Sequence, residues 1–141
     1  MRPPTEQPFR SGFAGLIGLE LQTLADDEVR AAFAVRDELK QPAGLVDGGV
    51  YATVAENICS AATWWALSEQ NRVTVGLSNH TSFLRPVTDG RVDAVARARH
   101  RGRTTWVWEV NFLDDRGRLC ALSRVTVAVR DPRQGPSAQP R

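Results

Sequence analysis

The chain has 141 residues, of which 42% are hydrophobic and 24% are charged, and its formal net charge is +2 at pH 7. This length suits one domain with a sizeable core, and the composition is that of an ordinary globular protein. The small net charge argues against a protein that binds polyanions over its whole surface. Its two cysteines show no metal-ligand spacing, so neither a disulfide scaffold nor a zinc site is indicated.

Both ends of the chain are rich in proline and polar residues. Residues 1–12 and 131–141 are therefore expected to be flexible segments that flank a folded domain of residues 13–130. The N-terminus has no apolar signal core, and no segment reaches the length of a membrane span. We expect a cytoplasmic protein that does not bind membranes.

Two strands are predicted first, over residues 15–24 and 29–39, around an Ala-Asp-Asp turn. In the second, Val29, Ala31 and Phe33 alternate with residues of the opposite face, which is typical of a half-buried strand. Such a strand buries one face and leaves the other toward solvent. We therefore expect an antiparallel hairpin at the start of the domain.

One long helix is predicted over residues 48–70. Between Gln41 and Leu67 only Asp47 and Glu56 carry a formal charge, so the helix is apolar on almost every side. A helix of this kind is normally buried, and an unpaired carboxylate is costly in such a place. Glu56 is therefore expected to have either strong local partners or a function.

Four further strands are predicted after the helix, over residues 72–85, 91–100, 104–113 and 118–130. Their short connections indicate hairpins and an antiparallel meander. The fold class is therefore α+β, with one long central helix wrapped by an antiparallel sheet of about five to six strands.

A narrow polar stripe follows one face of the predicted helix, through Thr53, Glu56, Ser60 and Thr63. At the helix start, Gly48-Gly49 leaves backbone N–H groups unobstructed at the positive end of the helix dipole. A carboxylate combined with preorganised donors is what acyl transfer requires. The alternative is a structural Glu56 bonded to its neighbours, with a simple tight turn before it.

The order of two strands, one helix that starts with Gly-Gly, and four strands resembles the hotdog-fold acyl-CoA thioesterases. Three blocks carry the resemblance, at residues 41–51, 78–86 and 102–110, and it extends over residues 15–129. Within the family, the chain is similar to the phenylacetate-pathway thioesterases and to the Arthrobacter-type 4-hydroxybenzoyl-CoA thioesterase.

The resemblance implies a catalytic site. Glu56 falls on the acidic residue that attacks the thioester carbonyl or activates water, and Ser60 falls on a hydroxyl residue that orients the attacking group. Gln41 and the Gly48 N–H fall on the groups that polarise the carbonyl. Asp47 replaces the histidine that usually precedes Gly-Gly, and we expect it to act as a helix cap.

The resemblance also implies contacts with coenzyme A. Arg97, Arg99, Arg101 and Arg103 recur at every second position, so they are candidates for a phosphate clamp on one strand face. A solvated strand face is the alternative, and nucleic-acid binding is less well supported. The residues assigned to substrate or CoA binding are Gly49, Phe83, Arg85, Arg101, Arg103, Thr104 and Thr105.

The function implied is hydrolysis of an acyl-CoA thioester to a carboxylate and CoA, without a metal or other cofactor. The family pairs two sheets edge to edge, so we expect a dimer or a dimer of dimers with the site between subunits. A non-catalytic acyl-CoA-binding module and a hotdog hydratase or dehydratase are the alternatives. The latter use a histidine and a carboxylate, and Asp47 at the histidine position argues against them. Aryl, phenylacetyl-like and medium-chain acyl groups all remain open, as does a carrier-protein thioester.

Overall fold

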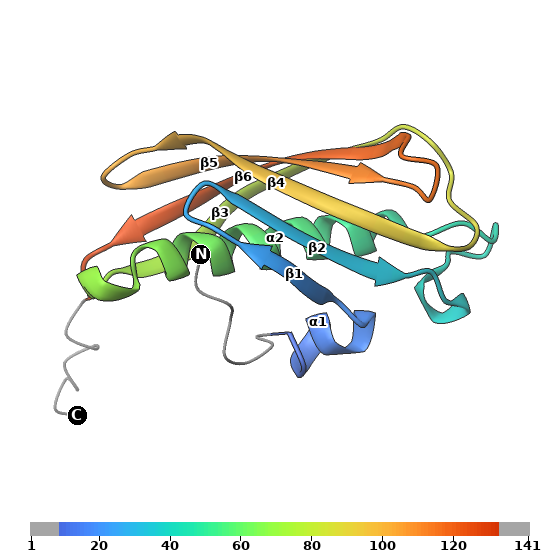
Figure 1. The fold of residues 1–141 in the computed structure, drawn as a ribbon, viewed down its shortest axis with the longest axis horizontal. Helices are drawn as coiled ribbons and strands as arrows, with labels where there is room; N and C mark the ends of the chain where they lie inside the picture. The colour runs from blue at the N-terminus through green and yellow to red at the C-terminus, as the bar shows by residue number, and fades with distance from the viewer. Residues whose placement is uncertain (1–8, 133–141) are drawn as a thin grey trace, which may run out of the picture.

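The computed structural model describes residues 9–132 as one antiparallel sheet curved around a long helix, α2 (Gly48–Ala66) (Figure 1). The six strands lie in the spatial order β1-β2-β4-β5-β6-β3. One helix on a six-stranded antiparallel sheet is the predicted hotdog arrangement. The strands are β1 (Glu20–Leu24), β2 (Glu28–Ala34), β3 (Val73–Phe83), β4 (Arg91–Arg101), β5 (Thr105–Leu113) and β6 (Leu119–Arg130).

The start of the domain differs from the prediction. A short helix, α1 (Gly12–Ile17), occupies the first part of the segment that we expected to be a strand. Gly18 ends this helix in the left-handed conformation at φ 76°, which favours glycine, and its N–H donates to the last carbonyls. Phe9 is already buried in the core, N-terminal to the expected domain start. Of the flexible segments expected at residues 1–12 and 131–141, residues 1–8 and 133–141 lie outside the described residues.

The second strand and the long helix both end earlier than predicted. β2 stops at Ala34 and is followed by a 3₁₀ turn, η1 (Asp37–Leu39). The helix stops at Ala66, and a second 3₁₀ turn, η2 (Ser68–Gln70), completes the segment. The N–H of Leu67 donates to the carbonyls of both Thr63 and Trp64, the tightening that is common in a last helical turn.

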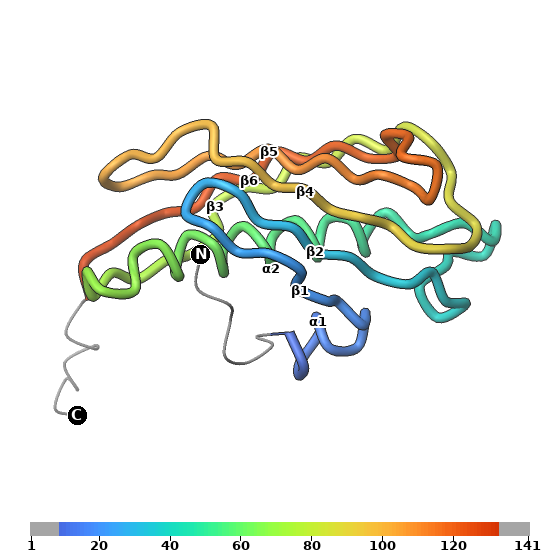
Figure 2. The backbone as a smooth tube through the Cα atoms, in the orientation of Figure 1, coloured from blue at the N-terminus to red at the C-terminus, as the bar shows by residue number. Residues whose placement is uncertain are grey.

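Only β4, β5 and β6 form the predicted meander. β3 pairs with β6 instead of β4 and lies at the edge of the sheet. Figure 2 follows the link from β3 to β4 around the end of the sheet where α2 begins. Val73, Val75 and Leu77 are 44%, 54% and 57% exposed, so this edge strand presents apolar side chains to solvent. Edge strands of this kind are ready to pair with another chain.

The core lies between the concave face of the sheet and one face of α2. Trp108, Phe33 and Phe112 are fully buried there. The indole N–H of Trp108 donates to Thr63 Oγ1 over 2.9 Å, which ties β5 to the helix. None of the helices between residues 9 and 132 is both long and apolar enough to cross a membrane.

Candidate active site

A cavity of about 360 Å³ opens at the N-terminal end of α2. The turn before the helix contributes Gln41, and the first turns of the helix contribute Gly48 and Tyr51. The end of β3 and the link after it contribute Phe83 and Arg85. Four of the predicted site residues therefore line one cavity, together with a tyrosine that the sequence analysis did not single out.

Backbone hydrogen bonds hold Gln41 at the rim of this cavity. The Gln41 N–H donates to the Leu45 carbonyl, and the Gly44 N–H returns to the Gln41 carbonyl, each over 2.9 Å. Gly44 has φ 86°, a conformation that glycine adopts without strain. The Val46 N–H donates to the carbonyl of Val87 over 2.9 Å, so the turn is fixed against the β3–β4 link.

Asp47 caps the helix, as the sequence predicted. Its Oδ1 accepts the Gly49 N–H over 2.8 Å. The N–H of Gly48 lies in the first turn, where no helical carbonyl can accept it, and no described residue accepts it. A Cβ added at Gly48 would lie 2.6 Å from Phe83 Cζ, so any larger residue would push that ring aside. The helix therefore presents a free backbone donor to the cavity.

Glu56 lies outside the cavity. It follows Gly48 by eight residues, which corresponds to about 12 Å along a helix. The expected burial of Glu56 is wrong for the single chain: the side chain is exposed, because it points to the open edge of the molecule beside β3. A Cβ added at Gly76 would lie 3.2 Å from Glu56 Oε1, so the strand passes close to the carboxylate.

The polar stripe on the helix bonds mainly to backbone groups. Thr53 Oγ1 donates to the Gly49 carbonyl and Thr63 Oγ1 to the Cys59 carbonyl, each over 2.8 Å. Ser60 Oγ is buried and has no hydrogen-bond partner among the described residues. The expected bond from Ser60 to Glu56 is therefore not formed within one chain.

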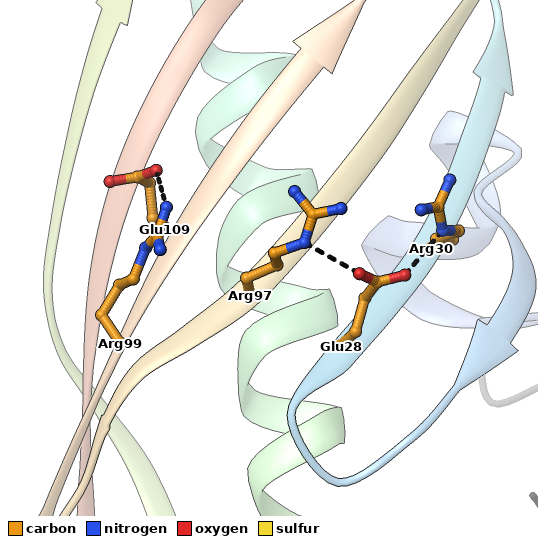
Figure 3. Close-up of polar contacts among 5 residues, drawn as sticks. All are labelled: Glu28, Arg30, Arg97, Arg99 and Glu109. Atoms are coloured by element: carbon orange, nitrogen blue, oxygen red, sulfur yellow. Dashed lines mark hydrogen bonds and ion pairs between the residues drawn. The ribbon is translucent and has the colours of Figure 1, made fainter.

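The four alternating arginines do not share one face. Arg97 and Arg99 lie on the outer face of the sheet, where Arg97 binds Glu28 over 2.9 Å and Arg99 binds Glu109 over 2.7 Å (Figure 3). Glu28 also binds Arg30 over 2.8 Å, and this hydrogen bond lowers the pKa of the Glu28 carboxyl. The solvated-face alternative is therefore confirmed for Arg97 and Arg99.

Arg101 and Arg103 belong to a different surface. The β4–β5 ladder shifts register between Ala98 and His100, and Arg101 then stacks on Trp106 at 4.7 Å from the ring centroid. Arg72, Arg101, Arg103 and Trp106 line a second cavity of about 460 Å³ beyond the C-terminal end of α2. Thr104 and Thr105 lead into β5 beside it. Within one chain, this basic cavity is far from Gln41 and Gly48.

Known proteins share this sequence and architecture. The model of the thioesterase superfamily matches residues 43–121, more than half of the chain. The chain belongs to the thioesterase superfamily. The 1,4-dihydroxy-2-naphthoyl-CoA hydrolase of Escherichia coli is 34% identical over 115 residues, which cover 82% of this chain and 84% of that protein. The proofreading thioesterase EntH of Cronobacter turicensis is 34% identical over 113 residues, with 80% and 82% covered.

A crystal structure of a mutant of thioesterase PA1618 from Pseudomonas aeruginosa superimposes with a TM-score of 0.81 at 33% identity, covering 86% of this chain and 87% of that one. The predicted hotdog fold and the predicted enzyme class, a thioester hydrolase, are therefore confirmed. Membership of the phenylacetate-pathway or 4-hydroxybenzoyl-CoA group stays a prediction.

Two further residues at or near this cavity were not predicted from the sequence. Asn79 Nδ2 donates to the Ala52 carbonyl over 2.8 Å and fixes β3 to α2 between the cavity and Glu56. Tyr51 lines the cavity but is only 3% exposed. Tyr51 lies on the buried face of a helix with many apolar residues, so spacing alone does not distinguish it from core packing.

Proposed function

We propose that this thioesterase hydrolyses acyl-CoA thioesters to a carboxylate and CoA, in a site that two copies of the chain share. The observation that carries the proposal is the separation of Glu56 from Gln41 and Gly48 within one chain, with an exposed edge strand beside Glu56. The E. coli relative is named for hydrolysis of a CoA thioester, which supports CoA as the thiol that is released.

Gln41 and Gly48 are proposed to polarise the thioester carbonyl. The Gly48 N–H is free, lies at the positive end of the α2 dipole and faces a cavity that Gln41 also lines. Donors that are already in place when negative charge develops on the oxygen stabilise the transition state most. Asp47 acts through the helix cap and takes no part in the chemistry.

Antiparallel pairing of two β3 strands would complete the site. If the pairing is centred on Ser78, the middle of β3, Gly76 of a second copy lies opposite His80. Within one chain, Gly76 and the nearby Glu56 carboxylate lie seven strand residues from Phe83, or about 23 Å along the strand. In the pair, the Gly76 of the second copy lies opposite His80, so its Glu56 carboxylate is only three residues from Phe83, or about 10 Å along the strand. Glu56 of the second copy therefore reaches the cavity better than Glu56 of the same chain.

The same pairing supports the proposed CoA contacts. It sets Phe83 of one copy opposite Val73 of the other, next to the cavity that Arg72, Arg101 and Arg103 line. The basic cavity of one copy would then continue the carbonyl site of the other, which Arg85 lines. Guanidinium groups in such a place suit the phosphates of CoA. Gly49, Thr104 and Thr105 are proposed to contact the same substrate.

The proposed reaction needs only protein groups, a thioester and water. Glu56 accepts a proton as water attacks the carbonyl carbon, and Gln41 and Gly48 stabilise the oxyanion. The C–S bond then breaks, and the CoA sulfur takes a proton as it leaves. Direct attack by Glu56 would instead form an anhydride that water hydrolyses, with the same products. Ser60 is proposed to position Glu56 in the paired state, where a second chain alters its surroundings.

Release of free thiol from a panel of acyl-CoA substrates, followed with a thiol reagent, tests the proposal. The parent protein should release CoA, and the Glu56→Gln variant should lose at least a hundredfold in kcat, the scale expected for a missing general base. Removal of one oxyanion donor in Gln41→Ala should cost about 3 kcal/mol of transition-state stabilisation. A Glu56→Gln variant that stays within tenfold of the parent would show that Glu56 is structural.

A further inference from the structure

Tyr51 is the one tyrosine of the chain, and its hydroxyl is isolated. The residue is 3% exposed, yet Tyr51 Oη has no hydrogen-bond partner among the described residues. A buried hydroxyl without a partner is costly, and phenylalanine would fill the same space without that cost. Packing therefore explains the Tyr51 ring but not its hydroxyl, which suggests that the hydroxyl binds a ligand.

Among the described residues, the surroundings of Tyr51 offer its hydroxyl no hydrogen bond of normal geometry, and the Cys120 thiol, a weak acceptor, lies close to it. Its ring contacts Phe112, Phe33 and Phe83, with centroid distances of 5.1, 6.2 and 6.1 Å. The neighbouring thiol of Cys120 directs its own hydrogen to the Phe112 carbonyl over 3.2 Å. Burial raises the pKa of Tyr51 well above its ordinary value, so the group stays a neutral phenol that can donate a hydrogen bond.

The position of Tyr51 links this hydroxyl to the substrate. The residue lines the same cavity of about 360 Å³ as Gln41 and Gly48, one helical turn from the proposed oxyanion donor. The other walls of this cavity include Leu45, Val46, Pro86 and Val87, which offer apolar surface to an acyl chain or ring. An acyl group that enters from the carbonyl end meets Tyr51 as it goes deeper.

We infer that Tyr51 is a specificity-determining residue, whose hydroxyl binds an oxygen substituent on the acyl group and selects oxygenated acyl groups over plain ones. This inference rests on the proposed function. A site that hydrogen-bonds a substrate oxygen discriminates strongly against the analogue that lacks it, because the protein group is then left unpaired. An apolar pocket alone separates such analogues poorly.

Matched substrate pairs test this inference. The pairs are benzoyl-, phenylacetyl- and octanoyl-CoA, each with its monohydroxylated positional isomers, and kcat/KM is measured for the parent and for Tyr51→Phe. For at least one pair, the parent should prefer the hydroxylated substrate by tenfold or more. Tyr51→Phe should bring that ratio to within about twofold of one, because kcat/KM for the hydroxylated substrate falls more than kcat/KM for its plain partner.

Thr63→Val is the matched control. It also removes a buried hydroxyl of α2, but Thr63 bonds the indole of Trp108 and does not line the cavity. This variant should lower stability and leave every substrate ratio unchanged. The inference about Tyr51 is wrong if the parent and Tyr51→Phe show the same preference, or if the parent prefers no hydroxylated substrate. Either result leaves the proposed acyl-CoA hydrolysis unaffected. If the parent hydrolyses no member of the panel, the proposed function itself fails.

The single tyrosine also gives a direct binding signal. Protein labelled with ¹³C at the tyrosine ζ carbon should show one resonance, which shifts when the carboxylic acid released from the preferred hydroxylated substrate is added. The plain acid should shift it much less at the same occupancy. Identical shifts with both acids would show that a trapped water or the protein alone determines the state of the phenol, and this would contradict the inference.

Discussion

At the scale of single residues, the close approach of Gly76 to Glu56 gives the first prediction. A Cβ at position 76 would lie 3.2 Å from Glu56 Oε1, and the backbone of Gly76 is not in the left-handed region. Gly76→Ala should therefore fold but displace the carboxylate, and kcat should fall about tenfold, since small misplacements of reacting groups are costly. Thermal unfolding of the variant should match the parent. Unchanged turnover would show that the position of Glu56 beside β3 is unimportant.

Asp47 gives a second prediction at this scale. Asparagine keeps the oxygen that accepts the Gly49 N–H and removes the charge, so Asp47→Asn should preserve both stability and turnover. Asp47→Ala removes the cap and should cost about 1 kcal/mol of stability. Chemical denaturation and thiol release measure the two effects. A hundredfold loss of kcat in Asp47→Asn would give Asp47 a role in the chemistry.

Among the site residues, local sequence patterns predicted the roles that depend on local structure alone. The capping role of Asp47 and the free donor at Gly48 follow from their place at a helix start, and the structure has both. The exposure of Glu56 and the isolation of Tyr51 could not be read from spacing. They depend on which face of α2 meets the sheet and on what β3 leaves uncovered.

At the scale of elements, the β4–β5 hairpin separates two kinds of arginine. Arg101 and Arg103 line the basic cavity, whereas Arg97 and Arg99 form ion pairs on the outer face. Replacing Arg101 and Arg103 together with alanine should raise KM for acyl-CoA about tenfold with little change in kcat, because remote phosphate contacts bind the ground and transition states alike.

The double replacement of Arg97 and Arg99 with alanine is the control for that prediction. Their exposed ion pairs contribute little to stability, so this variant should fold normally and keep the parent KM. Steady-state kinetics at low salt compare the two variants. Equal KM values for the two double variants would show that the basic cavity does not bind CoA.

The elements themselves were predicted with uneven success. The long helix and the strands after it follow from their apolar patterns and short turns, and most of their bounds agree with the structure. The segment that forms α1 was predicted to be a strand. Ala14 and Ile17 face the core with the three-residue spacing of a helix, but a helix of only six residues shows this spacing once and gives no repeating pattern. The pairing of β3 with β6 is a non-local contact that no local pattern specifies.

At the scale of the whole molecule, the edge of the sheet formed by β3 leaves apolar surface exposed to solvent. β3 has a partner strand on one side only. In addition to the exposed apolar residues of this strand, Trp64 of α2 is 55% exposed. Two copies joined through this edge would cover apolar surface and form one continuous sheet. The resemblance to the hotdog thioesterases, more than any local pattern in this sequence, led us to expect such a pairing.

The central claim is that each site combines Gln41 of one copy with Glu56 of another, and mixing two defective variants tests it most directly. Glu56→Gln and Gln41→Ala are unfolded and refolded together in equal amounts, and thiol release is compared with that of each variant refolded alone. If sites are shared, one site in four combines an intact Gln41 with an intact Glu56, so the mixture should recover about a quarter of the parent activity. Activity no higher than the average of the two variants alone would place Gln41 and Glu56 of each site in the same chain and contradict the account.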